Sequence, residues 1–445
     1  MKATRFFSGI SLVTTLILAH ALLAFGQGPP AHARAGKVIP GQYIVVLEPE
    51  VSQPDFLFYH GLSAFHRYSV INGLAVRMSA ERAADISADS RVRYVVPDVT
   101  VSIIERPSEP PGQEKKLKEP LPDDPPVGPL QETPNGILRI HANPNTIDAS
   151  AIKVAIIDTG IQKDHPDLNV AGGVNYTPGP PKKYNDGHGH GTHVAGIVGA
   201  LNNGIGVVGV APGVRLNAVR VLDDNGSGSL SGVIAGVDWA ASHGMDVANM
   251  SLGAQWLYED DPLCDAIDSA VNRGVTMVVA AGNMGDYADV YTPAHCLNAI
   301  TVSAIADSDG LPGGYGGATS YGEDDTFATF SNLGWLVDIA APGVDILSTF
   351  KGGTYETMSG TSMASPHVAG AAALFIAKNP GASPAVVAAA LITNGFPQLD
   401  DEPDGEGVSG DPDRWLCGFW GELGFPEWDE MSCGAYEPLV NAEGL

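Results

Sequence analysis

The chain has 445 residues, enough for two or three domains, and 44% of them are hydrophobic, as in a globular protein with a substantial core. The formal net charge is −27, and residues 1–130 hold 13 acidic and 13 basic side chains. The excess acid therefore lies in residues 131–445, a region that we expect to repel nucleic acid and anionic membranes. A solvated acidic surface explains this charge, and cation binding is compatible with it.

The first 26 residues read as a secretory signal peptide. Lys2 and Arg5 precede an apolar run over residues 10–25, with small residues near a plausible cleavage point. A membrane anchor is the alternative, but polar residues interrupt the run, which is shorter than the roughly 20 apolar residues of a span. Since no second run of that length follows, we expect residues 1–26 to be removed and the chain to be secreted without an anchor.

Residues 38–104 predict a small α+β domain. A helical composition occurs at residues 79–89, and strand-like patterns occur at residues 42–47, 73–78 and 92–96. Residues 105–130 are rich in proline and charge, which predicts an extended linker that proteases can reach.

Short apolar strands alternate with helical patterns from Gln131 onward. The strands are at residues 153–157, 216–221, 246–250 and 276–280, and the helices are at residues 191–201, 232–242 and 262–273. The alternation predicts an α/β domain over residues 131–445, with a mostly parallel sheet and helices on both faces. Active-site residues of such sheets gather at the carboxyl ends of strands, where Asp158 and Asn283 occur.

Four cysteines in an exported chain allow three disulfide pairings. We favour the local pairs, Cys264 with Cys296 and Cys417 with Cys433. Cys296 precedes a strand-like segment and can face the helix that begins near Cys264. The spacing Cys-x-x-Cys is absent from the sequence, so the cysteines do not indicate a metal site.

Three motifs carry the functional interpretation. They surround Asp158 (residues 155–160), His190 (residues 186–196) and Ser362 (residues 360–370). A serine hydroxyl is a poor nucleophile until an imidazole takes its proton and a carboxylate holds that imidazole in the right tautomer. Lipase-type hydrolases place the acid between Ser and His and end the serine motif in Gly, whereas here Asp158 comes first and Ala364 fills that position.

From about Pro134 to Asn441 the chain resembles the subtilisin-like serine protease (subtilase) family. The resemblance implies a serine endopeptidase that cleaves protein and peptide substrates through an acyl-enzyme. It makes Ser362 the nucleophile, His190 the general base and Asp158 the residue that orients the base. His188 and His193 compete for the role of base, and the family pattern makes His193 structural.

The resemblance also assigns the groups that bind the substrate. The amide of Asn283 and the backbone N–H of Ser362 are the expected oxyanion donors. Two segments would pair with an extended peptide, and they comprise Ser227, Gly228, Ser251, Leu252 and Gly253. A plain flexible loop is the alternative for the first segment.

Residues 38–104 look like the inhibitory prodomain of subtilases, which also assists folding. The chain would then be a self-processing zymogen, cut within residues 105–130, whose prodomain is an intramolecular inhibitor. We expect the enzyme to be a monomer. A catalytically silent binding protein that keeps the fold is the rival interpretation.

Structural calcium (Ca²⁺) follows from the same resemblance. The implied ligands are the carbonyls of Leu201, Ile205 and Val207 and the side chains of Gln131, Asp167 and Asn203, an all-oxygen set suited to calcium. A metal-free turn is the alternative, and Asp307 is a weaker candidate for a second site.

The end of the chain, residues 436–442, resembles the start of the last subtilase helix. Residues 398–433 would then be an acidic, cysteine-containing insertion in the catalytic domain. Its carboxylates could bind further calcium or form a solvated surface.

Overall fold

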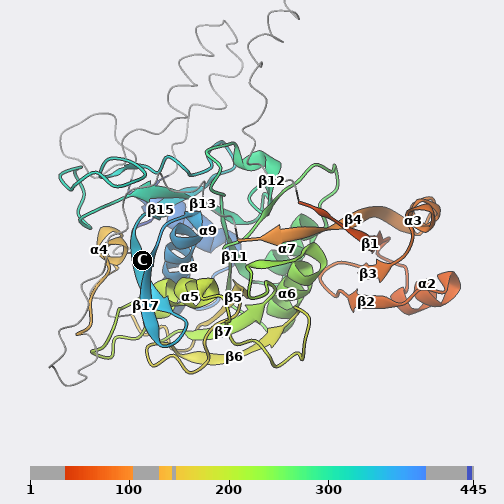
Figure 1. The fold of residues 1–445 in the computed structure, drawn as a ribbon, viewed down its shortest axis with the longest axis horizontal. Coiled ribbons are helices and arrows are strands. Elements are labelled where there is room, and N and C mark those ends of the chain that lie inside the picture. The colour runs from red at the N-terminus through yellow and green to blue at the C-terminus, as the bar shows by residue number, and fades with distance from the viewer. Residues whose placement is uncertain (1–35, 104–129, 143–146, 397–437, 443–445) are drawn as a thin grey trace, which may run out of the picture. The chain divides into compact units, whose positions relative to one another are not determined.

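The computed structural model describes residues 36–103, 130–142, 147–396 and 438–442 (Figure 1). The predicted signal peptide, most of the linker and the insertion at residues 398–433 lie outside these ranges. In the part of the chain that is described, no helix is both long enough and apolar enough to cross a membrane.

Residues 36–103 form the N-terminal domain, a helix-flanked antiparallel sheet. Its elements are β1 (Val38–Leu47), α2 (Gln53–His60), β2 (Ala64–Arg67), β3 (Gly73–Arg77), α3 (Ala80–Ser87) and β4 (Val92–Ser102). The strand order is β2-β3-β1-β4, and the tail of β4 continues the sheet onto β8 (Ser227–Ser229). The structure confirms the predicted strands and α3. It adds α2, whose Phe58 and Tyr59 are exposed and therefore obscure the helical pattern.

The remaining described residues form the main domain, built on an eight-stranded sheet. Its strands are β5 (Lys153–Asp158), β6 (Val170–Asn175), β7 (Arg215–Arg220), β9 (Val247–Met250), β11 (Thr276–Ala280), β13 (Ile300–Ala306), β14 (Thr326–Phe327) and β15 (Ile339–Pro342). The order is β14-β13-β11-β9-β5-β7-β6, with β15 also paired to β13. Only β14 is antiparallel among these described strands, so the mostly parallel α/β prediction is confirmed.

Helices cover both faces of this sheet (Figure 1). Alternate side chains of a strand point to opposite faces. Val154 and Ile156 of β5 accordingly pack with one set of helices, and Ala155 and Ile157 pack with the other. The first set is α5 (His190–Gly199), α8 (Thr361–Lys378) and α9 (Pro384–Asn394), and the second is α6 (Leu230–Ser242) and α7 (Pro262–Asn272).

Short elements complete the main domain. They are α4 (Asn135–Arg139), the 3₁₀ helix η1 (Ala288–Val290), and the pairs β10 (Ala254–Gln255) with β12 (Tyr291–Thr292) and β16 (Ile346–Phe350) with β17 (Thr354–Met358). Residues 438–442 are extended rather than helical, because Leu439 pairs with Ala340 and Phe396.

Candidate active site

Asp158 and His190 meet at the carboxyl edge of the sheet. Asp158 ends β5, His190 begins α5, and both side chains are buried. His190 Nδ1 lies 2.9 and 3.0 Å from the two carboxylate oxygens of Asp158. The backbone N–H of Thr159 donates a 2.6 Å hydrogen bond to the same carboxylate. The pair therefore fixes the imidazole so that Nε2 is the atom left for chemistry.

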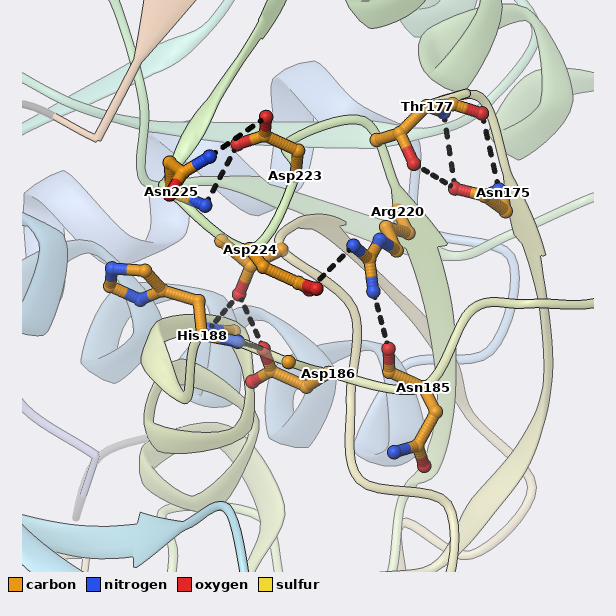
Figure 2. Close-up of polar contacts among 12 residues, drawn as sticks. Asn175, Thr177, Asn185, Asp186, His188, Arg220, Asp223, Asp224 and Asn225 are labelled. Carbon is orange, nitrogen blue, oxygen red and sulfur yellow. Dashed lines mark hydrogen bonds and ion pairs between the residues drawn. The ribbon is translucent and has the colours of Figure 1, made fainter. Parts of the chain in front are cut away.

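A second buried carboxylate holds the start of α5 in place. Asp186 Oδ1 accepts a hydrogen bond from the backbone N–H of His188 (Figure 2). The same oxygen accepts from the N–H of Gly189 and from the hydroxyl of Thr159. Its Oδ2 accepts from the N–H and hydroxyl of Thr192. Because the first N–H groups of a helix lack partners within the helix, Asp186 substitutes for a capping side chain at Gly189.

Arg220 links the loop before α5 to the loop before β8. Its Nη1 donates to the carbonyl of Asn185 at 2.6 Å, and its Nη2 donates to Asp224 Oδ1 at 2.8 Å (Figure 2). Arg220 ends β7 and lies in register with Asp158 on β5. The arginine thus ties two loops that flank the Asp158–His190 pair, and no sequence motif pointed to it.

Ser362 lies in the first turn of α8. Its hydroxyl is 3.5 Å from the carbonyl oxygen of Ser251, and its side chain is buried. Within the described residues, His190 Nε2 has no hydrogen-bond partner. Catalytic hydrogen bonds are often long in the absence of substrate, so this arrangement is compatible with a serine–histidine pair that forms on binding.

Pro366 explains how Ser362 is anchored. Proline has no N–H, so the carbonyl of Ser362, four residues earlier, lacks its usual helical donor. The hydroxyl of Ser251 donates to that carbonyl at 2.9 Å, and the same hydroxyl lies 3.0 Å from Ser365 Oγ. Ser251 therefore holds the backbone of Ser362 in place through this hydrogen bond, a role that sequence reasoning missed.

Asn283 lies beside the start of α8. Its Oδ1 accepts hydrogen bonds from both the N–H and the hydroxyl of Thr361, each at 2.8 Å. These bonds fix the orientation of the amide, and Nδ2 is 3.1 Å from the position that a Cβ on Gly360 would take. The amide nitrogen is thus held next to the Ser362 turn, where an oxyanion donor would be needed.

The tail of β4 occupies the predicted substrate segments. Val101 pairs with Gly228, and Ser102 pairs with both Ser227 and Gly253. The hydrogen bonds with Gly253 are 3.2 and 3.0 Å long. These two segments therefore hold an extended peptide between them. The other two predicted residues, Ser251 and Leu252, are buried, and their side chains face the interior.

The chain matches two protein-family models, and both matches are consistent with the active-site geometry described above. Residues 149–410 match the model of the subtilase family, and residues 58–103 match the model of the peptidase inhibitor I9 family. The chain belongs to the subtilase family.

Individual relatives support the same conclusion. This subtilase is 40% identical to the alkaline protease of Alkalihalobacillus alcalophilus over 322 residues, 72% of this chain and 73% of the relative. It is 47% identical to subtilisin Savinase of Lederbergia lenta over 253 residues, 56% of this chain and 86% of the relative. The crystal structure of a cold adapted subtilisin-like serine proteinase matches with a TM-score of 0.50 and 35% identity, over 59% of this chain and 89% of that one. The chain is a subtilisin-type serine endopeptidase with an I9-type N-terminal domain.

Two other histidines of this subtilase are buried away from carboxylates. His193 Nε2 lies 3.0 Å from the carbonyl oxygens of Ile346 and Glu356, and burial lowers the pKa of His193 to about 3. Burial also lowers the pKa of His367, to about 4. Both imidazoles are therefore neutral at pH 7 and serve packing. His188 is half-buried next to the active-site loop, and burial lowers its pKa as well.

The six residues expected to hold calcium lie together: Gln131, Asp167, Leu201, Asn203, Ile205 and Val207. Asp167 Oδ2 accepts from the N–H of Val207 at 3.0 Å, whereas its buried Oδ1 has no hydrogen-bond partner in the described ranges. Burial raises the pKa of Asp167 to about 6. A buried carboxylate oxygen without a donor is what a bound cation would satisfy.

Backbone carbonyls converge beside this carboxylate. Gln131 Nε2 donates to the carbonyls of Leu201 at 2.7 Å and Val207 at 3.3 Å. Gln131 Oε1 accepts from the N–H of Gly204 at 3.1 Å in this orientation, so a 180° rotation that turned Oε1 toward the two carbonyls would exchange that bond for a contact with the ion. The donor set then consists of oxygen atoms, so the residues present fit calcium.

Asp307, the candidate for a second calcium site, belongs to a buried ionic cluster. Arg139 Nε lies 2.7 Å from Asp325 Oδ1 and 3.4 Å from Asp307 Oδ2, and the three side chains are almost fully buried. Asp309 and Asp324 lie close to Asp307, and burial raises the pKa of Asp307 to about 7. A protein cation thus already neutralises part of this charge.

Cys264 and Cys296 form a disulfide, with an S–S distance of 2.01 Å. This is the local pairing favoured by the sequence. The other predicted pair, Cys417 and Cys433, lies outside the described residues.

Proposed function

We propose that the protein is a secreted endopeptidase that hydrolyses proteins through an acyl-enzyme and is made as a self-processing zymogen. The observation that carries this proposal is the pairing of the β4 tail with β8 and Gly253, beside the Ser362 turn. We call the space between β8 and Gly253 the peptide track. An extended peptide bound there would lie beside Ser362, the paired His190 and the oriented amide of Asn283.

In the proposed mechanism, the Ser362 hydroxyl attacks the scissile carbonyl while His190 Nε2 takes its proton. Asp158 stabilises the imidazolium that forms, and the Asn283 amide and the Ser362 N–H stabilise the oxyanion. His190 then gives the proton to the leaving amine. A water molecule, activated by the same histidine, releases the acyl-enzyme.

We further propose that the N-terminal domain inhibits the enzyme until it is removed. Its tail lies where a substrate would pair, and the pairing extends to Ile103, whose N–H donates to the carbonyl of Gly226 at 2.9 Å. We expect the maturation cut at the beginning of the predicted linker, residues 105–130, because that part of the linker follows the paired tail directly.

We propose calcium as the structural ion of the site around Asp167. Bound there, it would neutralise the buried carboxylate and join residues 201–207 to Gln131 at the start of the main domain. Calcium has no part in the proton transfers above.

The test is to incubate the purified chain with calcium and a phosphonate that labels activated serines, and then to measure intact and peptide masses. We expect a product that begins within residues 105–131 and carries the label on Ser362. The variant Ser362→Ala should stay uncut and unlabelled, while Ser269→Ala, at a half-buried position of α7, should behave as the parent chain. Self-cutting of purified Ser362→Ala would contradict the proposal.

A further inference from the structure

Four potential metal ligands gather around the disulfide, and none of them belongs to the serine site described above. Two come from the start of α7 and two from the turn after β12, and they are Asp261, Cys264, His295 and Cys296. One ligand atom from each residue lies within 4.8 Å of the others. The spacing of the cysteines along the chain did not indicate a metal site, because the two halves of the cluster are about 30 residues apart in sequence.

We propose that reduction of this disulfide opens a tetrahedral zinc site whose ligands are these four side chains. Two thiolates, an imidazole and a carboxylate are a donor set that zinc prefers. The disulfide present in the structure keeps the site closed, so the same residues hold either an S–S bond or a metal ion.

The two ligands that are not cysteines already stand at nearly the required separation. His295 Nε2 lies 2.9 Å from Asp261 Oδ2. Nitrogen and oxygen ligands of a tetrahedral zinc ion, each bonded at about 2.1 Å, lie roughly 3.3 Å apart. A shift of a few tenths of an ångström would therefore admit the ion between them.

The partners of these two side chains also match those of metal ligands. His295 Nδ1 lies 3.3 Å from the carbonyl oxygen of Asp289, which would accept its proton while Nε2 binds metal. Asp261 Oδ1 accepts from the N–H of Leu263 at 2.8 Å, so the other oxygen is held toward the cluster. His295 is 18% exposed, which leaves a route for an ion from solvent.

Reduction of the Cys264–Cys296 disulfide requires an external reductant. A phosphine or a dithiol supplies two electrons, the S–S bond breaks, and the two sulfur atoms take up two protons as thiols. Zinc then displaces both protons as two Zn–S bonds form. The two sulfur atoms must move to roughly 3.8 Å apart, the separation set by Zn–S bonds of about 2.3 Å.

Cobalt(II) is a suitable probe, because its thiolate complexes absorb visible and near-ultraviolet light. The full chain would carry Ser362→Ala to prevent digestion and Cys417→Ser with Cys433→Ser to remove the other thiols, and it would be kept in calcium. After reduction with a phosphine we expect one equivalent of cobalt to bind, with a thiolate charge-transfer band, and zinc to displace it. The oxidised chain should show no such band.

Variants separate the four-ligand site from simple thiol binding. Asp261→Asn keeps a capping oxygen at the start of α7, and His295→Gln keeps a polar side chain, yet each should weaken cobalt binding by at least about tenfold. Asp260→Asn, the neighbouring exposed acid, is the matched control and should bind as the parent does. Unchanged affinity in both Asp261→Asn and His295→Gln would overturn the proposal.

Stability gives a second readout. Zinc should raise the Tm of the reduced chain by roughly 5 °C at saturating concentration, because it restores a link between α7 and the turn that follows β12. If the reduced chain is unfolded, zinc should restore its near-ultraviolet circular dichroism. A reduced chain that neither binds cobalt through thiolate nor regains structure with zinc would refute the site.

Discussion

Two of the regions through which the N-terminal domain touches the main domain differ in kind. Its tail, residues 100–103, pairs with β8 and Gly253 through backbone N–H and carbonyl groups. Any extended peptide can make such bonds, whatever its side chains. In the proposed function the tail therefore competes with the substrate and has no advantage over it in specificity.

The other region, which contacts α6, depends on particular side chains. The buried carboxylate of Asp98 accepts from the N–H and hydroxyl of Ser231 at the start of α6. In return, Asp238 on α6 accepts from the N–H groups of Ser69 and Val70 at 2.8 and 2.7 Å. Each domain thus supplies an acceptor that the other lacks, and a substrate peptide supplies neither. We therefore expect inhibition to depend on the tail and recognition of the N-terminal domain to depend on the contact with α6, so that mutations can separate the two.

The largest effect should follow from a substitution that blocks the peptide track between β8 and Gly253. A Cβ on Gly228 would lie 2.1 Å from the carbonyl oxygen of Val221, so Gly228→Ala must displace β8. We expect kcat/KM for a tetrapeptide substrate and the affinity for the β4 tail to fall together, by roughly 100-fold, or about 3 kcal/mol. Gly317→Ala, where nothing lies within 4 Å of the new Cβ, is the control. A fall in kcat/KM without a fall in the affinity for the tail, or the reverse, would show that the tail and the substrate do not share the track.

The proposed calcium site around Asp167 lies in the main domain, so its contribution to stability can be measured after the N-terminal domain has been removed. Burial raises the pKa of Asp167 to about 6, so in calcium-free protein the folded state binds a proton more tightly than the unfolded state does. Its stability should therefore fall as the pH rises from about 4 to about 6. Calcium requires the ionised carboxylate, so its contribution to Tm should appear over the same interval and level off above it.

The measurement is the Tm of processed enzyme, inhibited to prevent digestion, with calcium and with a chelator across that pH range. At 100 times its Kd, calcium should add about 2.7 kcal/mol. Asp167→Asn should abolish the difference between the two conditions. A calcium effect that is independent of pH would place the ion elsewhere.

A smaller effect is expected at the region on α6. Asp98→Ala leaves the Ser231 N–H and hydroxyl without their acceptor, at a cost of about 1–2 kcal/mol, whereas Ser229, which caps α6, is unchanged. Release of the cleaved N-terminal domain should become roughly tenfold faster, while kcat/KM for short peptides stays unchanged. Asp85→Ala, an exposed acid of α3, is the control. A matching loss of peptide hydrolysis would mean that the two regions are not separable.

The smallest effect should come from the exposed ion pair between Arg93 and Asp265. Their charged atoms are 3.5 Å apart, and the side chains are 45% and 31% exposed. Such pairs contribute at most about 1 kcal/mol, so Arg93→Ala should change the release rate about twofold, less in high salt. Tyr94→Phe, which removes a hydrogen bond to the same Asp265, should have the larger effect in the same assay.

The sequence predicted the parts of this fold that follow a simple apolar pattern. Strands β5 and β11 are buried on both faces and appear as uninterrupted apolar runs. The strand predicted over residues 92–96 continues to Ser102 as β4, past Pro97 and the polar Asp98. The polar residue belongs to the strand because its partner, Ser231, is supplied by the other domain, more than 130 residues later.

In the candidate site, likewise, some residues were predicted from sequence motifs and others were not. Asp158, His190, Ser362 and Asn283 stand in recognisable motifs, and the structure brings them to one edge of the sheet. The groups that hold them were not predicted. Arg220 lies outside the motifs, and the bond from Ser251 to the Ser362 carbonyl depends on the donor that Pro366 lacks, which only the folded backbone reveals.

The order of strands in the main sheet bears on how fast the chain can fold. Strand β5 lies between β7 and β9, whose paired residues are some 60 to 90 positions away, and α8 packs on the same sheet from still further along the chain. Contacts so distant in sequence must close long loops before they gain any stability, which makes folding slow. We expect the N-terminal domain, which contacts α6 and β8, to lower that barrier. We expect a chain that lacks this domain to reach the native state more slowly, and the processed enzyme to persist because unfolding must cross the same barrier in reverse.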